Sequence, residues 1–511
     1  MLIRYILSII VSYRKKVILL ILIATLVRCV LALSLNLGND EVYYLSYAQH
    51  LQWNYFDHPP MVALLIRLTT LDLNFVNDFS VRFGAIVLSA INTFLIYRIG
   101  VNIKDEKTGY IASLLFTSSF YSSIIAGLFI LPDTPQLFFW IVSIYILLQI
   151  LSKNSLYSQR VLLLLFGITV GLCTMSKIHG IFLWFGFGLY ILFFERKILV
   201  SPYLYLAILL TFLIVSPIVI WNISNDFITY KFHGNRVAIN SGVNFISFFR
   251  ELLGGFFYNN PINYFIIILG LIGFFKNKIM IPLFVKRLLL LVGLPLILIL
   301  LFLSLFRDTL PHWSGPGYVS LSILAAVYIA ENDKLDKWVR YSNFFILLVA
   351  ILGMLMINFF PGTLGKHNQE NLGENDFTLD MYNWSFFKEE FQKKIMNDHK
   401  EGITKTRFII NNKWFPGSHI DNYIAQPLGL DFLMLGDLND IHTYKWLNAV
   451  RSQLKKGDDA YFITTSNNFT SPEILYKEKF ATIKSPYIIR QFRNGKAVRQ
   501  MYVYLLLNYK P

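Results

Sequence analysis

Apolar runs of about twenty residues recur along the chain from Val17 to about Phe360, and each is long enough to cross a hydrocarbon core of ~30 Å as a helix. Hydrophobic residues make up 55% of the chain and charged residues 15%, whereas about a quarter of the residues in a typical soluble domain are charged. A single soluble core is therefore excluded. The chain is predicted to be a polytopic α-helical membrane protein.

The apolar runs predict about eleven transmembrane helices, at about residues 17–35, 80–102, 109–130, 134–151, 161–175, 180–194, 203–221, 262–275, 288–306, 316–330 and 343–360. The first is expected to be retained, because a basic break at residues 14–16 precedes a long apolar run with no small-residue cleavage signal. With the N-terminus in the cytoplasm, an odd number of spans places the residues after 360 outside the cytoplasm.

Basic residues support this orientation. They cluster in the loops that are predicted to be cytoplasmic: Arg14, Lys15 and Lys16; Lys104 and Lys107; Lys153 and Arg160; Arg196 and Lys197; Lys276, Lys278, Lys286 and Arg287; and Lys334, Lys337 and Arg340. Lys and Arg gathered in short cytoplasmic loops are a signature of membrane topology. The formal net charge of +15 is therefore assigned to topology, and no nucleic-acid partner is predicted.

The residues after 360 have a different composition. Residues 361–511 hold 20 Lys/Arg and 16 Asp/Glu, against 26 and 15 in the much longer stretch 1–360. Short apolar strands are predicted at 408–411 and 460–464, helices at 419–425 and 444–455, and a hairpin of 487–493 and 498–508 around Asn494-Gly495. We therefore predict a membrane domain over 1–360 and an extracytoplasmic α/β domain over 361–511, with a linker at about 362–380.

Unusual polar residues gather on the predicted outer face. They are Asn39-Asp40-Glu41, Asp57-His58-Pro59-Pro60, Pro132-Asp133, Ser176-Lys177, Trp221-Asn222, His233, Arg236, Arg307-Asp308 and His312-Trp313. Ionisable groups next to hydrocarbon cost free energy unless they are paired or hydrated, so they indicate a functional site. The alternative for any one of them is an ordinary polar loop end.

The first outer loop is the most informative. Its apolar and aromatic residues between 42 and 51 have the spacing of an amphipathic helix lying in the membrane interface. Asp40 and Glu41 stand at its start, where Asn39 or Asp40 is alternatively a simple helix cap. In the DHPP stretch, Pro59 favours an extended His58 and Pro60 favours a new helix at Met61.

Taken in order, these stretches resemble a known family. The patterns DExYY, YxDHPP, LPDTP, GLxxxSKxxG, PxxxWN and PHWSGPGY run from about Arg28 to Tyr318. They are similar to those of the bacterial family 39-like glycosyltransferases of the GT-C superfamily, relatives of the protein O-mannosyltransferases and of the lipid A aminoarabinose transferase. The motif order also matches the outer-face loops derived above.

The resemblance implies a GT-C fold and an integral membrane enzyme of the bacterial inner membrane. Such an enzyme takes one sugar from a polyprenyl (undecaprenyl) phosphate carrier and passes it to an acceptor on the periplasmic side. The bacterial branch with DHPP favours lipid A, lipopolysaccharide or another envelope glycan as the acceptor, and a protein hydroxyl is the alternative. Fold analogy supports the reaction class and does not choose the substrate.

The resemblance assigns catalytic roles to three acids. Asp40 orients or deprotonates an acceptor hydroxyl, and Glu41 supports it. If the acceptor is a phosphate, no strong base is needed and Asp40 mainly positions groups. Asp133 corresponds to the second acidic motif and fixes sugar or acceptor hydroxyls, with a helix cap as its alternative.

The donor phosphate is assigned to His58, Lys177, Arg236 and Arg307. Lys177 ends an apolar segment on the outer face and offers an ammonium as a point charge, although a lysine that snorkels to the interface has the same sequence context. His58 contacts the phosphate as a cation or as a neutral donor, or it merely anchors the turn. The polar loop from 222 to 261 is long enough to cover the site.

A metal and a sugar platform are left open. Asp57 and His58 occupy the place where aminoarabinose transferases carry a Glu-Lys pair that reaches a metal and the donor phosphate. Asp57 with His312 offers oxygen and nitrogen ligands for a divalent ion, but two ligands are too few to predict a site. The rings of Tyr43, Tyr44 and Trp313 offer faces for the sugar or the acceptor.

Two other function classes fit a chain with many spans. A transporter or lipid flippase carries its polar groups near the bilayer midplane along a two-sided pathway, whereas here they gather on one face. A glycan-binding scaffold leaves the DE and DHPP loops without a role. The enzyme is therefore the preferred prediction.

Overall fold

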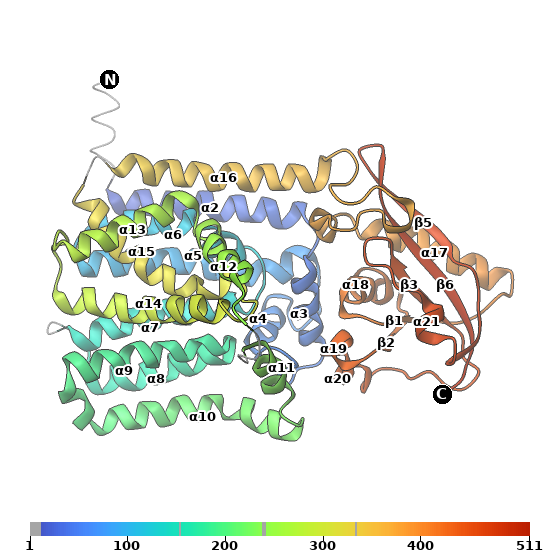
Figure 1. Ribbon diagram of the computed structural model, residues 1–511, viewed down its shortest axis with the longest axis horizontal. Coiled ribbons are helices and arrows are strands. Elements are labelled where there is room, and N and C mark those ends of the chain that lie inside the picture. The colour runs from blue at the N-terminus through green and yellow to red at the C-terminus, as the bar shows by residue number, and fades with distance from the viewer. Residues whose placement is uncertain (1–11, 153–154, 238–241, 333–334) are drawn as a thin grey trace. The chain divides into compact units, whose positions relative to one another are not determined.

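The computed structural model describes residues 12–152, 155–237, 242–332 and 335–511, without the side chains of 235–237. The chain divides into two compact units. The membrane unit comprises Met1–Val30 and Gln52–Ala350, and the C-terminal unit comprises Leu31–Leu51 and Ile351–Pro511. Each is described by itself, with the element labels of Figure 1. The domain boundary expected at residue 360 stays a prediction. The compact units themselves divide ten residues earlier, after Ala350, inside the helix Asp336–Phe359.

The membrane unit is built of helices. They are α2 (Tyr13–Ser34, whose end belongs to the C-terminal unit), α4 (Met61–Thr69), α5 (Asp78–Ile103), α6 (Glu106–Ser118), α7 (Asp133–Leu151), α8 (Gln159–Ser176), α9 (Phe182–Phe194), α10 (Pro202–Ser224), α11 (Ile228–Val237), α12 (Phe245–Tyr258), α13 (Pro261–Phe275), α14 (Leu283–Ser304), α15 (Gly315–Ala330) and α16 (Asp336–Phe359, whose end also belongs to the C-terminal unit). Short turns join them at Tyr121–Ile125, Ile178–Ile181, Arg196–Val200 and Pro311–Ser314.

Among the described residues, eight helices are long and apolar enough to cross a membrane, or nine if α12 and α13, bent by 98°, form one span. The predicted polytopic helical fold is confirmed, but the number eleven is not. The expected span at 109–130 is broken: α6 ends at Ser118, and a short π-helical turn follows at Tyr121–Ile125. Side chains of α13 and its cap support the break, because Asn260 donates to the carbonyl of Ser118 (3.0 Å) and Asn263 to that of Leu115 (2.9 Å). Carbonyls freed by a break need such partners inside a membrane.

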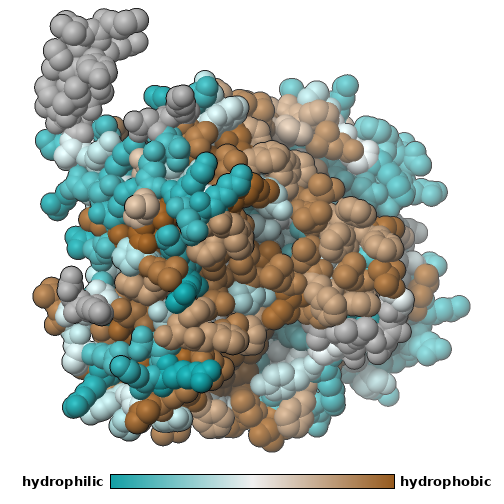
Figure 2. Space-filling model, turned by 60° about the vertical axis from the view of Figure 1, so that its left-hand side comes forward, coloured by the Kyte–Doolittle hydropathy of each residue, from teal (hydrophilic) through white to brown (hydrophobic). Residues whose placement is uncertain are grey.

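The helices of the membrane unit differ in how deeply they are buried, which distinguishes central helices from peripheral ones. In α7 and α15, 67% and 78% of the apolar window is buried, against 22% in α2 and 17% in α16. Exposed aliphatic and aromatic side chains cover the peripheral helices, and the space-filling view shows a broad hydrophobic surface bordered by hydrophilic patches (Figure 2). An apolar surface of this extent is stable when lipid covers it.

The C-terminal unit contains one sheet of six strands. They are β1 (Phe408–Asn411), β2 (Asp431–Met434), β3 (Ala460–Thr465), β4 (Phe480–Ile483), β5 (Tyr487–Arg493) and β6 (Lys496–Tyr509). Their order is β2-β1-β3-β6-β4, and β5 also pairs with β6. The β1 strand is parallel to β2 and β3, whereas β6 is antiparallel to its neighbours.

The helices of this unit are short, apart from α3 (Asn39–Gln49) and α17 (Ser385–Lys400). The others are α18 (Trp414–Ile420), α19 (Leu438–Ile441), α20 (Tyr444–Asn448) and α21 (Pro472–Tyr476), with single turns at Gln369–Asn371, Phe377–Met381, Asp421–Ala425 and Gln426–Leu428. The predicted α/β domain is thereby confirmed. The helix predicted at 444–455 is wrong in its length, and the sequence analysis did not predict β2, β4 or α17.

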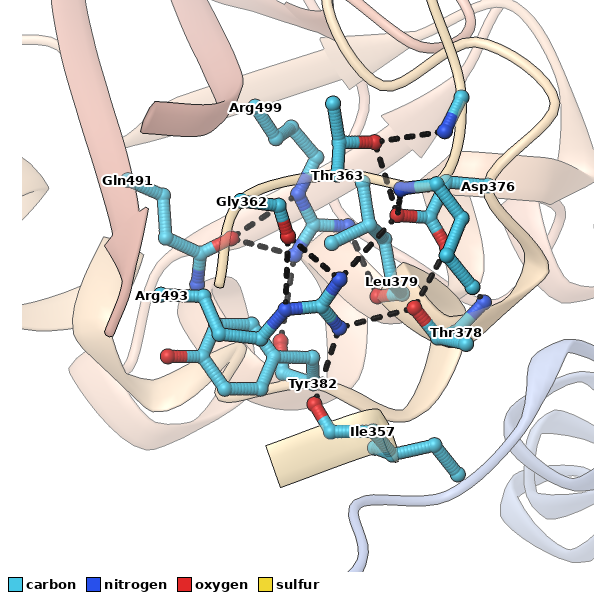
Figure 3. A network of polar contacts seen from close by, with 12 residues as sticks. Ile357, Gly362, Thr363, Asp376, Thr378, Leu379, Tyr382, Gln491, Arg493 and Arg499 are labelled. Atoms are coloured by element: carbon cyan, nitrogen blue, oxygen red, sulfur yellow. Dashed lines mark hydrogen bonds and ion pairs between the residues drawn. The ribbon is translucent and has the colours of Figure 1, made fainter. Parts of the chain in front are cut away.

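The predicted linker at 362–380 is not a free connection. Arg493, at the end of β5, is fully buried and donates to the carbonyl of Gly362 (2.7 Å) and to Thr378 (2.8 Å), and it pairs with Asp376 (3.3 Å; Figure 3). Arg499 of β6 donates to Gln491 (2.9 Å) beside it. A buried guanidinium is tolerated when its donors are satisfied in this way. The network therefore ties the segment to the β5–β6 hairpin.

Candidate active site

A buried ion pair stands at the centre of the membrane unit's polar residues. Lys177 Nζ lies 2.7 Å from Asp133 Oδ2, and each side chain is only 3% exposed. The hydroxyl of Tyr121 donates to the other carboxylate oxygen at 3.2 Å. Asp133 is the first residue of α7, and Lys177 directly follows α8. Lys177 therefore does not snorkel outward, and the carboxylate of Asp133 is engaged by two side chains.

Two glycines permit this arrangement. Gly180 donates its N–H to the carbonyl of Lys177 (2.9 Å), and a Cβ built on it would lie 2.6 Å from backbone atoms of Cys173 and Thr174. A Cβ on Gly315 would lie 2.5 Å from the ring of Tyr121. The glycines of the SKxxG and WSGPG patterns are thus sterically required.

Histidines and an aromatic ring surround the pair. Lys177, His233, His179 and His312 all act electrostatically on His58, and Lys177, His312 and His179 act on Asp133. The rings of His58 and His233 are 6.0 Å apart, and those of His179 and Trp313 are 5.5 Å apart. His58, His179, His312 and Trp313 are half-buried. The structure therefore brings the predicted residues Asp133, Lys177, His58 and His312 together, with Trp313 beside His179.

The DHPP loop is held from one side by α11. His233 Nε2 lies 2.7 Å from the carbonyl oxygen of Asp57. Thr229 donates to the carbonyl of Tyr55 (3.0 Å), and the buried Asn54 donates to Thr229 (2.9 Å). The segment expected to be a long covering loop at 222–261 is therefore largely helical, with α11 fixed to the loop that carries Asp57 and His58, and α4 begins at Met61 as predicted.

His58 is held in its neutral form. Desolvation of its ring, together with the positive charge of Lys177, lowers the pKa of His58 well below its usual value. A neutral imidazole has one N–H donor and one acceptor nitrogen. Of the two phosphate contacts that the sequence left open, the geometry favours the neutral donor over the cation.

The metal alternative finds no support. The described residues contain no group of three or more His, Cys, Asp or Glu that could hold a metal ion. Asp57 and His312 alone provide too few ligands for a site. No step of the reaction is therefore derived through a metal.

The first acidic motif belongs to the C-terminal unit. Glu41 is buried, and its carboxylate accepts the N–H of Gly38 at 2.8 Å, closing the first turn of α3. Asn39 donates to Asp380 at 2.9 Å. Asp40, between them, is exposed. Glu41 thus has a structural role that its pairing with Asp40 in sequence did not indicate, while the carboxylate of Asp40 is accessible.

The helix α3 is not the surface-lying helix that was expected. All its residues from Glu41 to Ala48 are buried. The ring of Tyr43 is 5.1 Å from that of Trp414, and Tyr44 is 5.3 Å from Tyr47. The predicted sugar contact of Tyr43 and Tyr44 stays a prediction that this packing does not support, because both rings are at most 5% exposed.

The two predicted arginines are less informative. Arg236 lies in α11, but its side chain is outside the described residues. Arg307 is half-buried in the loop after α14, and its carbonyl accepts from Ser247 at 2.7 Å. Sequence reasoning missed His179 and Tyr121. His179 lies inside the GLxxxSKxxG pattern and was available as a signal, whereas no motif contains Tyr121.

An apolar cavity is lined in part by residues on either side of Lys177 in the chain. It has a volume of about 610 Å³ and lies between α8, α9 and α10, lined by Thr174, Ile178, Ile181, Trp184, Gly188, Ile191, Leu192, Leu199, Leu204, Ile208, Thr211, Phe212 and Val215. Thr174 and Ile178 flank Lys177 in the chain, whereas Leu199 and Leu204 lie beyond the far end of α9. The cavity therefore extends from the neighbours of Lys177 along the length of a helix.

Comparisons with known proteins agree with this geometry. Residues 57–221 match the model of a family described as dolichyl-phosphate-mannose-protein mannosyltransferase. The crystal structure of ArnT from Cupriavidus metallidurans bound to undecaprenyl phosphate has a TM-score of 0.64 at 12% identity, covering 96% of this chain and 98% of that one. Its apo structure gives a TM-score of 0.62 at 11% identity with the same coverage. No curated protein sequence matches the chain.

Proposed function

We propose that the chain is a GT-C superfamily membrane glycosyltransferase and that its donor is a sugar linked to a polyprenyl phosphate such as undecaprenyl phosphate. The family model covers residues 57–221, which include Asp57, His58, Asp133 and Lys177. The fold is shared over nearly the whole chain with ArnT, whose structure was determined with undecaprenyl phosphate bound.

One observation carries the proposal. The ammonium of Lys177 is fixed by Asp133, and its chain neighbours Thr174 and Ile178 line an almost wholly apolar cavity of about 610 Å³. A polyprenyl phosphate has the same two parts, an anionic head and a long hydrocarbon tail. We place the head at Lys177 and the tail between α8, α9 and α10.

The residues around Lys177 suit the departure of a lipid phosphate. An ammonium has three donors, so Lys177 can keep its bond to Asp133 and still donate to phosphate oxygens. The phosphate gains negative charge as the glycosidic bond breaks, and a positioned cation stabilises that charge. Neutral His58 contributes an N–H donor, and Asp133 keeps the ammonium in place.

The acceptor is assigned to the exposed carboxylate of Asp40, which orients or deprotonates an acceptor hydroxyl. Two acceptor classes are proposed. The resemblance of the motifs to the bacterial branch with DHPP supports a lipid or envelope glycan such as lipid A. The family model favours a protein hydroxyl. In both cases the reaction takes place on the outer face of the bacterial inner membrane.

Mass spectrometry of envelope lipids, glycans and proteins tests the proposal. Cells lacking the protein are complemented with the wild type, Asp40→Asn or Lys177→Met. The wild type restores one sugar-sized mass increment, whose carrier molecule identifies the acceptor class. Asp40→Asn abolishes that increment, and Lys177→Met lowers it about 100-fold, the usual cost of removing a donor that stabilises developing charge.

The controls separate chemistry from folding. Lys177→Met leaves a buried carboxylate unpaired, which costs about 3–5 kcal/mol, so the double variant Asp133→Asn/Lys177→Met is tested beside it. Lys276→Met, at an exposed lysine, keeps wild-type product levels. Wild-type product from a membrane-inserted Lys177→Met variant contradicts the donor site. An unchanged glycome with an altered distribution of carrier lipid points to the flippase instead.

A further inference from the structure

A second cavity lies away from the candidate active site. It has a volume of about 240 Å³ and is lined by Tyr13, Lys16, Lys107, Tyr110, Ile111, Leu114, Asp336, Val339 and Arg340. These residues come from the first turn of α2, the first three turns of α6 and the first two turns of α16. None of them lines the cavity between α8, α9 and α10. The cavity is therefore a separate feature of the membrane unit.

The lining carries excess positive charge. Lys16, Lys107 and Arg340 provide three cations, against the single carboxylate of Asp336. These cations come from three of the basic clusters that the sequence places in cytoplasmic loops, far apart in the chain. The fold therefore brings to one cavity three positive charges that lie in separate loops of the sequence.

Specific contacts fix the cations in place. Lys16 Nζ lies 4.9 Å from the centre of the Tyr13 ring, which is 5.7 Å from that of Tyr110. Lys107 Nζ donates to the carbonyl of Ala330 at 2.8 Å. These contacts hold both ammonium groups at the starts of their helices.

The rest of the lining is apolar. Ile111 and Leu114 lie one and two turns after Lys107 on α6, and Val339 lies between Asp336 and Arg340 on α16. A free inorganic anion gains nothing from such a surface, whereas a molecule with an anionic head and hydrocarbon chains matches both parts. Charge and apolar surface together thus specify the class of ligand.

We propose that this cavity binds the phosphate headgroup of an anionic phospholipid from the membrane leaflet at this end of the unit. Lys16 and Arg340 approach the phosphate from α2 and α16, and Lys107 approaches it from α6. The bound lipid joins the starts of three helices, two of which, α2 and α16, are the least buried of the unit's candidate spans. The inference is independent of the proposed donor and acceptor.

Native mass spectrometry of the full chain, released from detergent with defined lipids, tests this site. Phosphatidylglycerol is compared with phosphatidylcholine for the wild type, for Lys16→Gln/Arg340→Gln, and for the matched control Lys15→Gln/Lys337→Gln. The control removes the same charge one and three residues away, from exposed lysines outside the lining. We expect one tightly bound phosphatidylglycerol, weakened about tenfold or more in the site variant and unchanged in the control.

Three results would overturn the proposal. Equal losses in the site and control variants mean that general surface charge attracts the lipid. Equal binding of the two lipids by the wild type means that the cavity does not select an anion. Full displacement of phosphatidylglycerol by millimolar inorganic phosphate means that the apolar lining adds nothing and the site takes free phosphate. Thermal melting of each variant, with added phosphatidylglycerol stabilising only proteins that bind it, checks that loss of folding is not the cause.

Discussion

At the scale of single residues, Asp380 links the DE motif to the rest of the C-terminal unit. Its carboxylate accepts from Asn39, its carbonyl accepts from the indole of Trp384 (2.8 Å), and His419 lies 3.1 Å from the same carbonyl. Burial, with smaller contributions from the charges of Asp376 and Asp40, raises the pKa of Asp380 to about 7 against the opposing effects of Arg499 and the Asn39 hydrogen bond. The carboxyl that holds the start of α3 is therefore largely protonated below neutral pH.

Asp380→Asn tests this raised pKa. Between pH 4 and pH 7, the carboxyl of Asp380 is protonated in the folded wild type and ionised in the unfolded chain. This group therefore lowers the free energy of unfolding by about 1 kcal/mol for each unit that the pH rises in this range. The Asp380→Asn variant has no carboxyl at this position, so its free energy of unfolding does not fall for this reason as the pH rises. We expect its stability relative to the wild type to increase from pH 4 to pH 7 and to level off above pH 7.

Thermal melting of the full chain across this pH range provides the measurement. Asp437→Asn removes a carboxylate from an exposed position of the same unit and is measured over the same pH range as a control. A constant difference between Asp380→Asn and the wild type contradicts the raised pKa.

At the scale of elements, the turn between α8 and α9 positions the ion pair. Lys177 is extended (φ −157°, ψ 136°), and the turn that follows packs against the last residues of α8 through Gly180. The motif GLxxxSKxxG indicated this segment. The predicted span before it matches α8, whereas the one predicted after it, at 180–194, is a shorter apolar helix. The break in α6 was not predictable from apolarity, because the amide side chains that satisfy it come from residues 260 and 263.

Gly180→Ala should displace Lys177. The added methyl group would lie 2.6 Å from backbone atoms of α8, so the turn must shift by several tenths of an ångström. We expect product formation to fall about 100-fold, as misplacement of a positioned group commonly causes, while the amount of inserted protein changes little. Quantitative mass spectrometry of the product measures the effect.

Gly353→Ala is the matched control, because no atom lies within 4 Å of the added methyl group. Product formation by this variant should equal that of the wild type. Wild-type activity in Gly180→Ala would show that the close packing of this turn is not needed to place Lys177.

At the scale of the whole molecule, the basic loops predict the orientation in the membrane. The loop between α9 and α10 carries Arg196 and Lys197 and is placed in the cytoplasm, and the C-terminal unit is placed outside. The active-site proposal requires this orientation, since the acceptor is met on the outer face.

Single cysteines in a Cys29→Ala/Cys173→Ala background measure the orientation. Lys477→Cys and Lys197→Cys each replace an exposed lysine. A maleimide that does not cross the inner membrane should label residue 477 in intact cells and residue 197 only after permeabilisation. The reverse pattern would contradict the orientation and, with it, the proposed side of the reaction.

The sequence by itself determined the helical membrane class and the α/β domain, and it predicted the GT-C resemblance and the motif residues Asp133 and Lys177. Those features depend on local apolarity, on turn residues such as Asn494-Gly495 in the left-handed region (φ 46° and 79°), and on short patterns. Only the tertiary structure decided that Tyr121 bonds to Asp133, that Glu41 closes a turn while Asp40 is exposed, and that α3 belongs with residues 351–511. These facts depend on contacts between residues far apart in the chain, or on which of two neighbouring side chains the fold buries. A local sequence pattern predicts neither.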